Sequence, residues 1–121
     1  MTTLIFSLFP SFTPVHAANL IVTSLADTEI VDGNCTLTEA IKNADNNAAT
    51  NLDCAAGSGA DIITFSVSGT IVLGSSLPII HDTAGLTING AGQSVAITGN
   101  DLYQLLVISV NASLTLENLA F

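Results

Sequence analysis

Positive charge is almost absent from this chain of 121 residues, which has one lysine, no arginine and ten acidic residues. Nucleic acid is a disfavoured partner at a net charge of −9, because Lys and Arg supply most of the affinity for phosphates. Anionic membrane surfaces are disfavoured for the same reason. Charged residues make up only 9% of the chain, against roughly 25% in typical soluble domains. The surface must therefore consist mainly of Ser, Thr, Asn and Gly.

Hydrophobic residues make up 49% of the chain, which is enough for a core, and a short apolar run occupies residues 4–9. Val15 and Ala17 then place small residues at the −3 and −1 positions of a signal-peptidase site. We predict that residues 1–17 are a secretory signal peptide, although no Lys or Arg precedes the apolar run. The alternative, a buried first strand, is disfavoured by two prolines. The run is too short to span a bilayer, so we expect no membrane span.

The chain has two cysteines, Cys35 and Cys54. In an exported chain an even number favours a disulfide, which here would close a loop of about 20 residues. Such a loop restricts the unfolded chain by roughly 3 kcal/mol. Free buried thiols are the alternative. A zinc site is disfavoured because His16 falls in the signal peptide and His81 lies far away in the sequence.

A helix is predicted to begin at Thr36 and to end near residue 44 or 45. Thr36 and Glu39 have the spacing of a capping box, in which each side chain bonds the backbone N–H of the other residue. The apolar residues then recur at i, i+3, i+4 and i+7, on one helical face: Leu37, Ala40, Ile41 and Ala44.

The connection before this helix is rich in oxygen donors. Asp27, Glu29, Asp32 and Asn34 are closely spaced, which makes them weak candidates for a calcium site. Their spacing is not that of an EF-hand loop, and acidic turns are common. We otherwise expect no cofactor.

Strands are predicted on both sides of the helix, the first at residues 19–25. From residue 61 on, short apolar segments recur, each closed by Gly, Asn, Asp or Ser, at residues 62–65, 70–73, 77–80, 86–88, 95–98, 105–110 and 114–116. Residues 86–89 (LTIN) and 114–118 (LTLEN) echo each other 28 residues apart, and residues 62–64 precede Leu86 by 24. Three short strands in each such period are typical of a parallel β-helix, in which each coil buries its inward residues by stacking on its neighbours.

An antiparallel sandwich of short strands is the alternative, since similar spacing can produce it. The turns lack a regular two-residue hairpin signature, which disfavours the sandwich. We therefore expect an all-β chain, a parallel β-helix (solenoid) with an N-terminal capping strand and one short α-helix. Leu37, Ala40 and Ile41 are predicted to cover the end of the first coil, at residues 62–65.

Residues 35–41 (CTLTEAI) resemble the box that names the CSLREA domain, found in exported bacterial proteins ahead of a right-handed parallel β-helix with a pectin-lyase-like fold. Further matching segments occur in the expected order, at residues 22–27, 32–35, 60–65, 69–71 and 86–90. The family's Ser is Thr36 here, which preserves the cap, and its Arg is Thr38, which loses a charge. The resemblance implies a cap over residues 18–61 and the first two-plus coils over residues 62–121.

The resemblance implies a non-catalytic, adhesin-like structural role in a secreted or cell-surface protein, with an extracellular ligand such as carbohydrate. The alternative is a fragment of a polysaccharide-active lyase or hydrolase whose catalytic residues lie beyond Phe121. A lyase needs a cation and a base, and the only Lys lies on the predicted helix. For hydrolysis, Asp82 and Asp101 are candidates only as downstream acids in separate turns, and His81 is more consistent with a loop pair. A Thr-rich surface-binding face is disfavoured, since no regular Thr-x-Thr array is present.

The last residues, 119–121, fall just inside a third coil. Solenoids usually need at least three repeats and a polar terminal cap. We therefore expect the sequence to be the N-terminal part of a longer protein, with further coils after Phe121.

Overall fold

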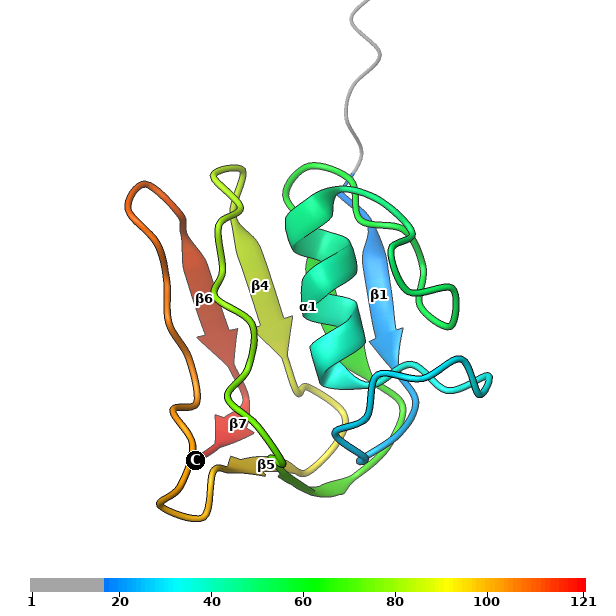
Figure 1. The fold of residues 1–121 in the computed structure, drawn as a ribbon, viewed down its shortest axis with the longest axis vertical. Helices are drawn as coiled ribbons and strands as arrows, with labels where there is room; N and C mark the ends of the chain where they lie inside the picture. The colour runs from blue at the N-terminus through cyan, green and yellow to red at the C-terminus, as the bar shows by residue number, and fades with distance from the viewer. Residues whose placement is uncertain (1–16) are drawn as a thin grey trace, which may run out of the picture.

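The computed structural model describes residues 17–121, and the predicted signal peptide therefore lies outside the described residues except for Ala17. Within this range the chain forms two parallel β-sheets and one short helix, α1 (Leu37–Asn46) (Figure 1). The mainly-β class predicted from the sequence is thus confirmed. In the part of the chain that the structure describes, no helix is long and apolar enough to cross a bilayer.

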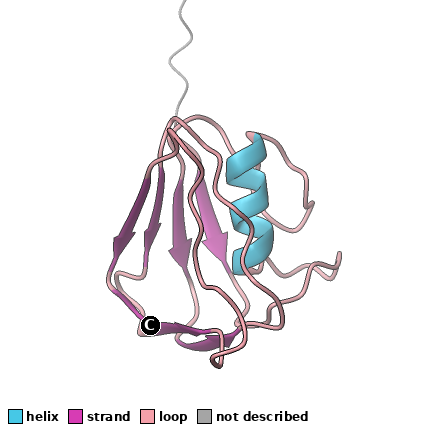
Figure 2. Cartoon of the chain, turned by 60° about the vertical axis from the view of Figure 1, so that its left-hand side comes forward, coloured by secondary structure: helices cyan, strands magenta, loops and turns pink. Residues whose placement is uncertain are grey.

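The strands form two separate sheets (Figure 2). Neighbouring strands within each sheet are distant in sequence. The first sheet has four parallel strands, in the order β1 (Asn19–Val22), β2 (Ile62–Phe65), β4 (Leu86–Asn89) and β6 (Leu114–Glu117). The second sheet has three parallel strands, in the order β3 (Gly69–Val72), β5 (Val95–Thr98) and β7 (Leu119–Ala120). Since no hairpin joins neighbouring strands within either sheet, the antiparallel alternative is wrong.

The register of the strands matches the sequence echo. Leu86 pairs with Leu114, and the side chains of Asn89 and Glu117, 28 residues apart, are hydrogen-bonded at 2.8 Å. Ile62 pairs with Thr87, one residue later than the sequence spacing indicates. The 28-residue echo thus gives the register of β4 and β6, whereas β2 and β4 pair one residue away from their 24-residue spacing.

Two of the predicted strands are reduced to a single contact. Residues 77–80 and 105–110 meet only at the parallel bridge between Ile80 and Ile108. Pro78 has no N–H to donate, which disfavours a regular ladder in the first of these segments. The first strand also ends earlier than predicted, because Thr23 turns away to exchange hydrogen bonds with Cys35 at 2.9 Å.

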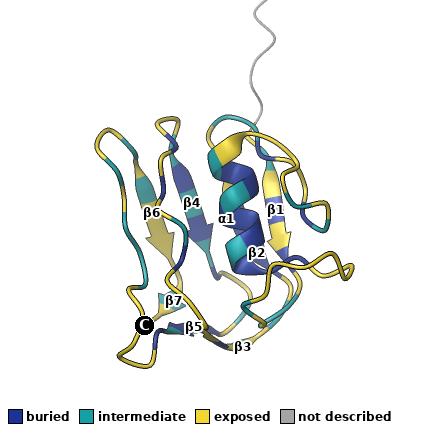
Figure 3. Cartoon of the chain, viewed as in Figure 1, coloured by how far each residue is buried: buried dark blue, intermediate teal, exposed yellow. Residues whose placement is uncertain are grey.

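Alternating side chains of each strand point inward and form one core. One row of paired positions crosses the whole first sheet and consists of Leu20, Ile63, Ile88 and Leu116. The first three are completely buried, whereas Leu116 is 39% exposed. Burial of this inward row is therefore complete at β1, β2 and β4 and falls sharply at β6, which has only intermediate and exposed residues (Figure 3).

Helix α1 begins where the sequence predicts and extends one or two residues further. The helix ends at Asn46, and the next residue, Asn47, has a φ of 49°, the left-handed conformation common after helices. Leu37, Ala40 and Ile41 are buried, as predicted. The helix was predicted to cover residues 62–65, which form β2. Instead, β1 pairs with the edge of β2, and α1 packs against β1.

Candidate functional site: the disulfide-linked N-terminal segment

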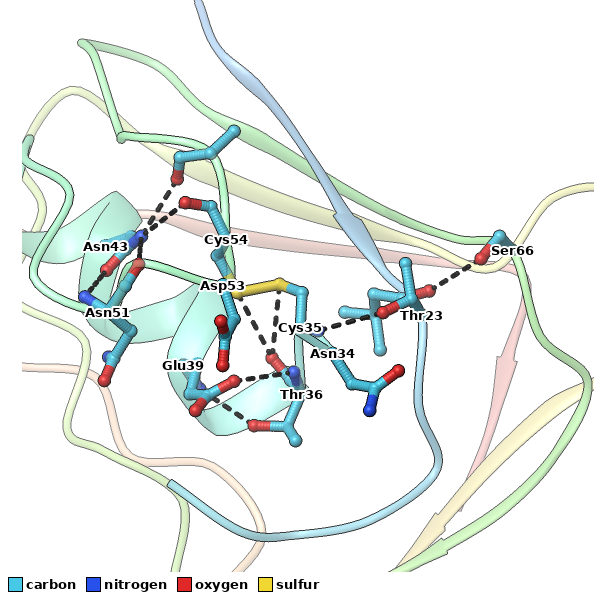
Figure 4. Close-up of a disulfide and its surroundings, with 12 residues drawn as sticks. Thr23, Asn34, Cys35, Thr36, Glu39, Asn43, Asn51, Asp53, Cys54 and Ser66 are labelled. Atoms are coloured by element: carbon cyan, nitrogen blue, oxygen red, sulfur yellow. Dashed lines mark hydrogen bonds between the residues drawn. A yellow bond between two sulfur atoms is a disulfide. The ribbon is translucent and has the colours of Figure 1, made fainter. Parts of the chain in front are cut away.

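The N-terminal segment, residues 18–61, contains most of the residues singled out by the sequence. Cys35 and Cys54 form the predicted disulfide, with Cα atoms 4.9 Å apart. Both residues are buried, and their sulfur atoms lie 3.8 and 4.0 Å from the carbonyl oxygen of Thr36 (Figure 4). The bridge therefore fastens the loop that follows α1 to the start of the helix.

The predicted capping box is present at the first turn of α1. The Glu39 N–H donates to Thr36 Oγ1 at 3.3 Å, and the Thr36 N–H donates to Glu39 Oε2 at 3.0 Å. The Thr36 hydroxyl also donates to the Thr28 carbonyl at 2.8 Å. Glu39 is only 1% exposed, so its carboxylate serves the backbone and does not face solvent.

Asn43 organises the disulfide loop, and sequence reasoning missed it. Its side chain is fully buried, and its amide nitrogen donates to three carbonyl groups, those of Asn51, Cys54 and Ala55. Its side-chain oxygen accepts the Asn51 N–H at 2.7 Å. Because these bonds are to backbone groups in a loop without periodic sequence, only the buried position on the helix could have suggested them.

Gly57 lies directly against the backbone of α1. A Cβ atom at residue 57 would lie 2.1 Å from the Asn43 carbonyl oxygen and 2.6 Å from the Ala44 Cα. Since both are backbone atoms, no side-chain rotation could relieve the overlap. Only glycine allows the loop to lie this close to α1.

Thr38, in the first turn of α1, has a hydroxyl that donates to Asp27 Oδ1 at 2.6 Å. The other oxygen of this carboxylate, Oδ2, accepts the Gly74 N–H at 2.8 Å. Gly74 follows β3, so Asp27 connects the helix to the second sheet.

The four calcium candidates do not converge on one point. Asp27 bonds Thr38 and Gly74, Glu29 pairs with Lys42, and Asp32 accepts the backbone N–H of Asn34 at 2.9 Å. Among residues 17–121 there is no group of three or more His, Cys, Asp or Glu side chains that could hold a metal ion. We therefore propose no calcium site.

Asp45, near the end of α1, receives two backbone N–H groups from the segment around Ile80. Its Oδ1 accepts from His81 at 2.6 Å and from Asp82 at 2.7 Å. On the opposite side of this segment, Ile80 bonds the backbone of residues 107 and 109. The helix thus supplies an acceptor where another strand would otherwise be needed.

No family model, no curated protein and no solved structure matches this chain. The likeness to the CSLREA domain therefore rests on the sequence motifs alone.

The remaining candidates for chemistry do not form a catalytic arrangement. His81 is exposed and its neighbour Asp82 is buried, as expected for adjacent residues that point in opposite directions. Asp101 is exposed in a separate turn, with a φ of 58°. The His81 ring nitrogen Nδ1 lies 3.1 Å from the Ser109 hydroxyl and has no carboxylate partner among the described residues. The contact between His81 and Ser109 joins two neighbouring loop segments.

Proposed function

We propose that this chain is the capped first part of a right-handed parallel β-helix of the CSLREA type, and that its role is structural and adhesive. The N-terminal segment closes one end of the stack, and the strands after residue 61 form its first coils. The full protein acts at the cell surface or in the medium. No catalytic step is assigned to the residues described above.

The observation that carries this proposal is the repeated parallel pairing on three sides of the chain. The strands β2, β4 and β6 pair in order, as do β3, β5 and β7, and Ile80 bridges Ile108 in the same sense. Connections between parallel strands are almost always right-handed, which supports the proposed hand.

The two ends of the stack differ, which supports a cap at the N-terminal end and further coils at the other. At β1 the inward residues Leu20 and Val22 are fully buried under α1. At β6 the inward residue Leu116 is 39% exposed, and Ile108, opposite the fully buried Ile80, is 49% exposed. An added coil would cover these side chains and gain roughly 25 cal/mol for each Å² of apolar surface.

The stacking can be tested with nitroxide spin labels at outward positions of the second sheet. Thr70 pairs with Ala96, so labels introduced by T70C and A96C should sit on neighbouring strands about 4.8 Å apart and broaden each other's spectra. Labels at T70C and T87C, which lie in different sheets, form the matched control. Equal, unbroadened spectra from both pairs would contradict the proposed stack.

The compartment has its own test. The buried disulfide fits an oxidising environment, and cleavage after Ala17 would release a chain that begins at Ala18. We expect mass spectrometry of the exported protein to find this N-terminus and no free thiol. A protein recovered only from the cytosol, with residues 1–17 intact, would contradict the proposal.

The adhesive role is tested by separating binding from turnover. The exported chain is incubated with polygalacturonate and with neutral glycans, and unsaturated products, reducing ends and bound glycan are measured. We expect binding to the neutral glycans and new chain ends from none of the glycans, because a chain with a net charge of −9 disfavours the polyanionic polygalacturonate as a partner. Cleavage by the wild-type chain would favour the polysaccharide-active alternative.

A further inference from the structure

Asp61 is a buried carboxyl group to which the arrangement described so far gives no positive partner. It lies directly before β2, and its side chain is only 1% exposed. A buried carboxylate normally needs a cation or several hydrogen-bond donors. The chain has no Arg, and its single Lys, Lys42, is bonded to Glu29. No Lys or Arg side chain is therefore left to pair with Asp61.

The hydrogen bonds to the Asp61 carboxylate come from two backbone N–H groups. Its Oδ1 accepts the N–H of Ala18 at 2.9 Å, and its two oxygens accept that of Ser58 at 2.9 and 3.0 Å. Asp61 thus joins the residue before β1 to the end of the disulfide loop. One of its two donors, Ala18, is also the first residue that cleavage after Ala17 would leave on the chain.

The position of Ala18 depends on contacts that lie on the C-terminal side of its nitrogen. The Ala18 carbonyl accepts the N–H of Ile62 at 2.9 Å, and the next residue, Asn19, pairs with Ile62 in the parallel ladder. Ala18 is half-buried and packs against the core, whereas Ala17 is exposed. Removal of the residues before Ala18 therefore leaves its nitrogen beside the Asp61 carboxylate.

We propose that Asp61 is a binding site for the α-ammonium group of Ala18, which cleavage after Ala17 creates. The site rests on the function proposed above, because it exists only if that cleavage occurs. Hydrolysis of the Ala17–Ala18 peptide bond consumes one water molecule. Its oxygen goes to the new carboxylate of Ala17, and its two protons convert the Ala18 N–H into an ammonium group. The hydrogen bond of 2.9 Å then becomes an ion pair with a buried carboxylate.

An ammonium group suits this site better than the peptide N–H that precedes it. The peptide offers Asp61 one donor and no charge, whereas the ammonium group offers three donors and a positive charge. Because Ala18 is only half-buried, the protons that do not face Asp61 remain open to water. Cleavage should therefore fasten the start of β1 more tightly to the end of the disulfide loop than the uncleaved chain allows.

The other charged groups at this junction are acidic. Burial raises the pKa of Asp61 above its ordinary value of 3.8, the two backbone N–H bonds oppose this rise, and the charge of Asp82 adds to it. Asp45 of α1 accepts the backbone N–H groups of His81 and Asp82, and the His81 side chain is exposed. A positive charge on Ala18 lowers the cost of an ionised Asp61 and relieves its repulsion from these acids.

The pH range of the effect follows from the new amine. Pairing with Asp61 raises the pKa of the native α-amine above its ordinary value of about 7.7–8.0. The stability that the pair contributes is therefore complete below about pH 7.7 and is lost as pH rises through the raised native value. On the acidic side, protonation of Asp61 removes the pair.

The pairing is tested by a ¹³C NMR titration of the Ala18 methyl group between pH 6 and 11. The sample is the exported protein, after mass spectrometry has identified its first residue. We expect the α-amine to titrate about 1 pH unit or more higher in the native protein than in the same protein unfolded in urea. D61N should remove this difference. D101N makes the same charge change at an exposed turn and should retain it.

Urea midpoints of the full chain of 121 residues and of the cleaved chain give a second measurement. At pH 7 cleavage should raise the midpoint in the wild type and in D101N and leave that of D61N unchanged. At pH 11 the rise in the wild type should disappear. Each comparison is made within one variant, so a lower overall stability of D61N does not affect it.

Three results would overturn the proposal, and they separate the pairing from the cleavage. Equal titration of Ala18 in the native and unfolded wild type would refute the ion pair without any variant. An equal rise of the midpoint on cleavage in the wild type and in D61N would assign the gain to the loss of residues 1–17. An exported protein that begins at another residue would refute the cleavage itself, whereas the first two results leave the cleavage standing.

Discussion

Reduction of the Cys35–Cys54 disulfide should lower the free energy of unfolding by about 3 kcal/mol. The two cysteines are 19 positions apart, and closing a loop of this size removes about 11 cal/mol/K of entropy from the unfolded chain, or roughly 3 kcal/mol at 25 °C. Both cysteines are buried beside the Thr36 carbonyl in the bonded form, so we expect reduction to change the native packing little. The effect should therefore come mainly from the unfolded chain.

The measurement is urea unfolding with and without reductant, followed by far-UV circular dichroism because the chain has no tryptophan. For a chain of this size the urea dependence is about 1–2 kcal/mol/M, so reduction should lower the midpoint by roughly 2 M. The bridge is verified in each sample by counting free thiols.

A double variant, C35S with C54S, provides the control, since reductant should leave its midpoint unchanged. If the bridged and reduced wild-type chains unfolded at the same urea concentration, the loop-entropy argument would be refuted. If the double variant were far less stable than the reduced wild type, sulfur packing would outweigh the bridge.

Four further substitutions test the contacts of the N-terminal segment by urea unfolding. T36A removes the helix cap and should cost about 1 kcal/mol, more if the lost bond to the Thr28 carbonyl matters. N43D puts a carboxylate against three carbonyl groups and should cost about 3 kcal/mol or more, whereas the same change at exposed Asn46 should cost well under 1 kcal/mol. G57A should destabilise by about 1–3 kcal/mol through overlap with the helix backbone, and a neutral result would contradict that close approach. T38R puts a cation beside the Asp27 carboxylate and should raise the free energy of unfolding by up to about 1 kcal/mol. This increase should disappear in 1 M salt.

Features encoded by neighbouring residues could be predicted from the sequence. The helix start depends on two residues three positions apart, and its buried face on a period within ten residues. The match between β4 and β6 was visible because stacked strands place like residues in register. The disulfide followed from two cysteines and a leader-like N-terminus, without any three-dimensional information.

Features that depend on distant partners could not be predicted. The Asp27–Gly74 bond joins residues 47 apart, and nothing local marks either residue as half of a pair. The role of Asn43 is equally invisible, because its partners are backbone carbonyl groups. A short apolar segment also need not form a strand. Residues 105–110 have a strand-like sequence but pair only at Ile108.

The acidic residues described in this chain act largely as acceptors for backbone N–H groups. The backbone N–H groups of a strand normally donate to carbonyl groups of the neighbouring strand. The segment of β1 supplies such carbonyl groups to β2. Asp27 accepts the N–H of Gly74 after β3, and Asp45 accepts those of His81 and Asp82. Carboxylates accept such bonds strongly and need no cation when donors surround them. This explains how a folded chain can have ten acids and one lysine, and why a paucity of cations need not indicate a site for a positively charged ligand.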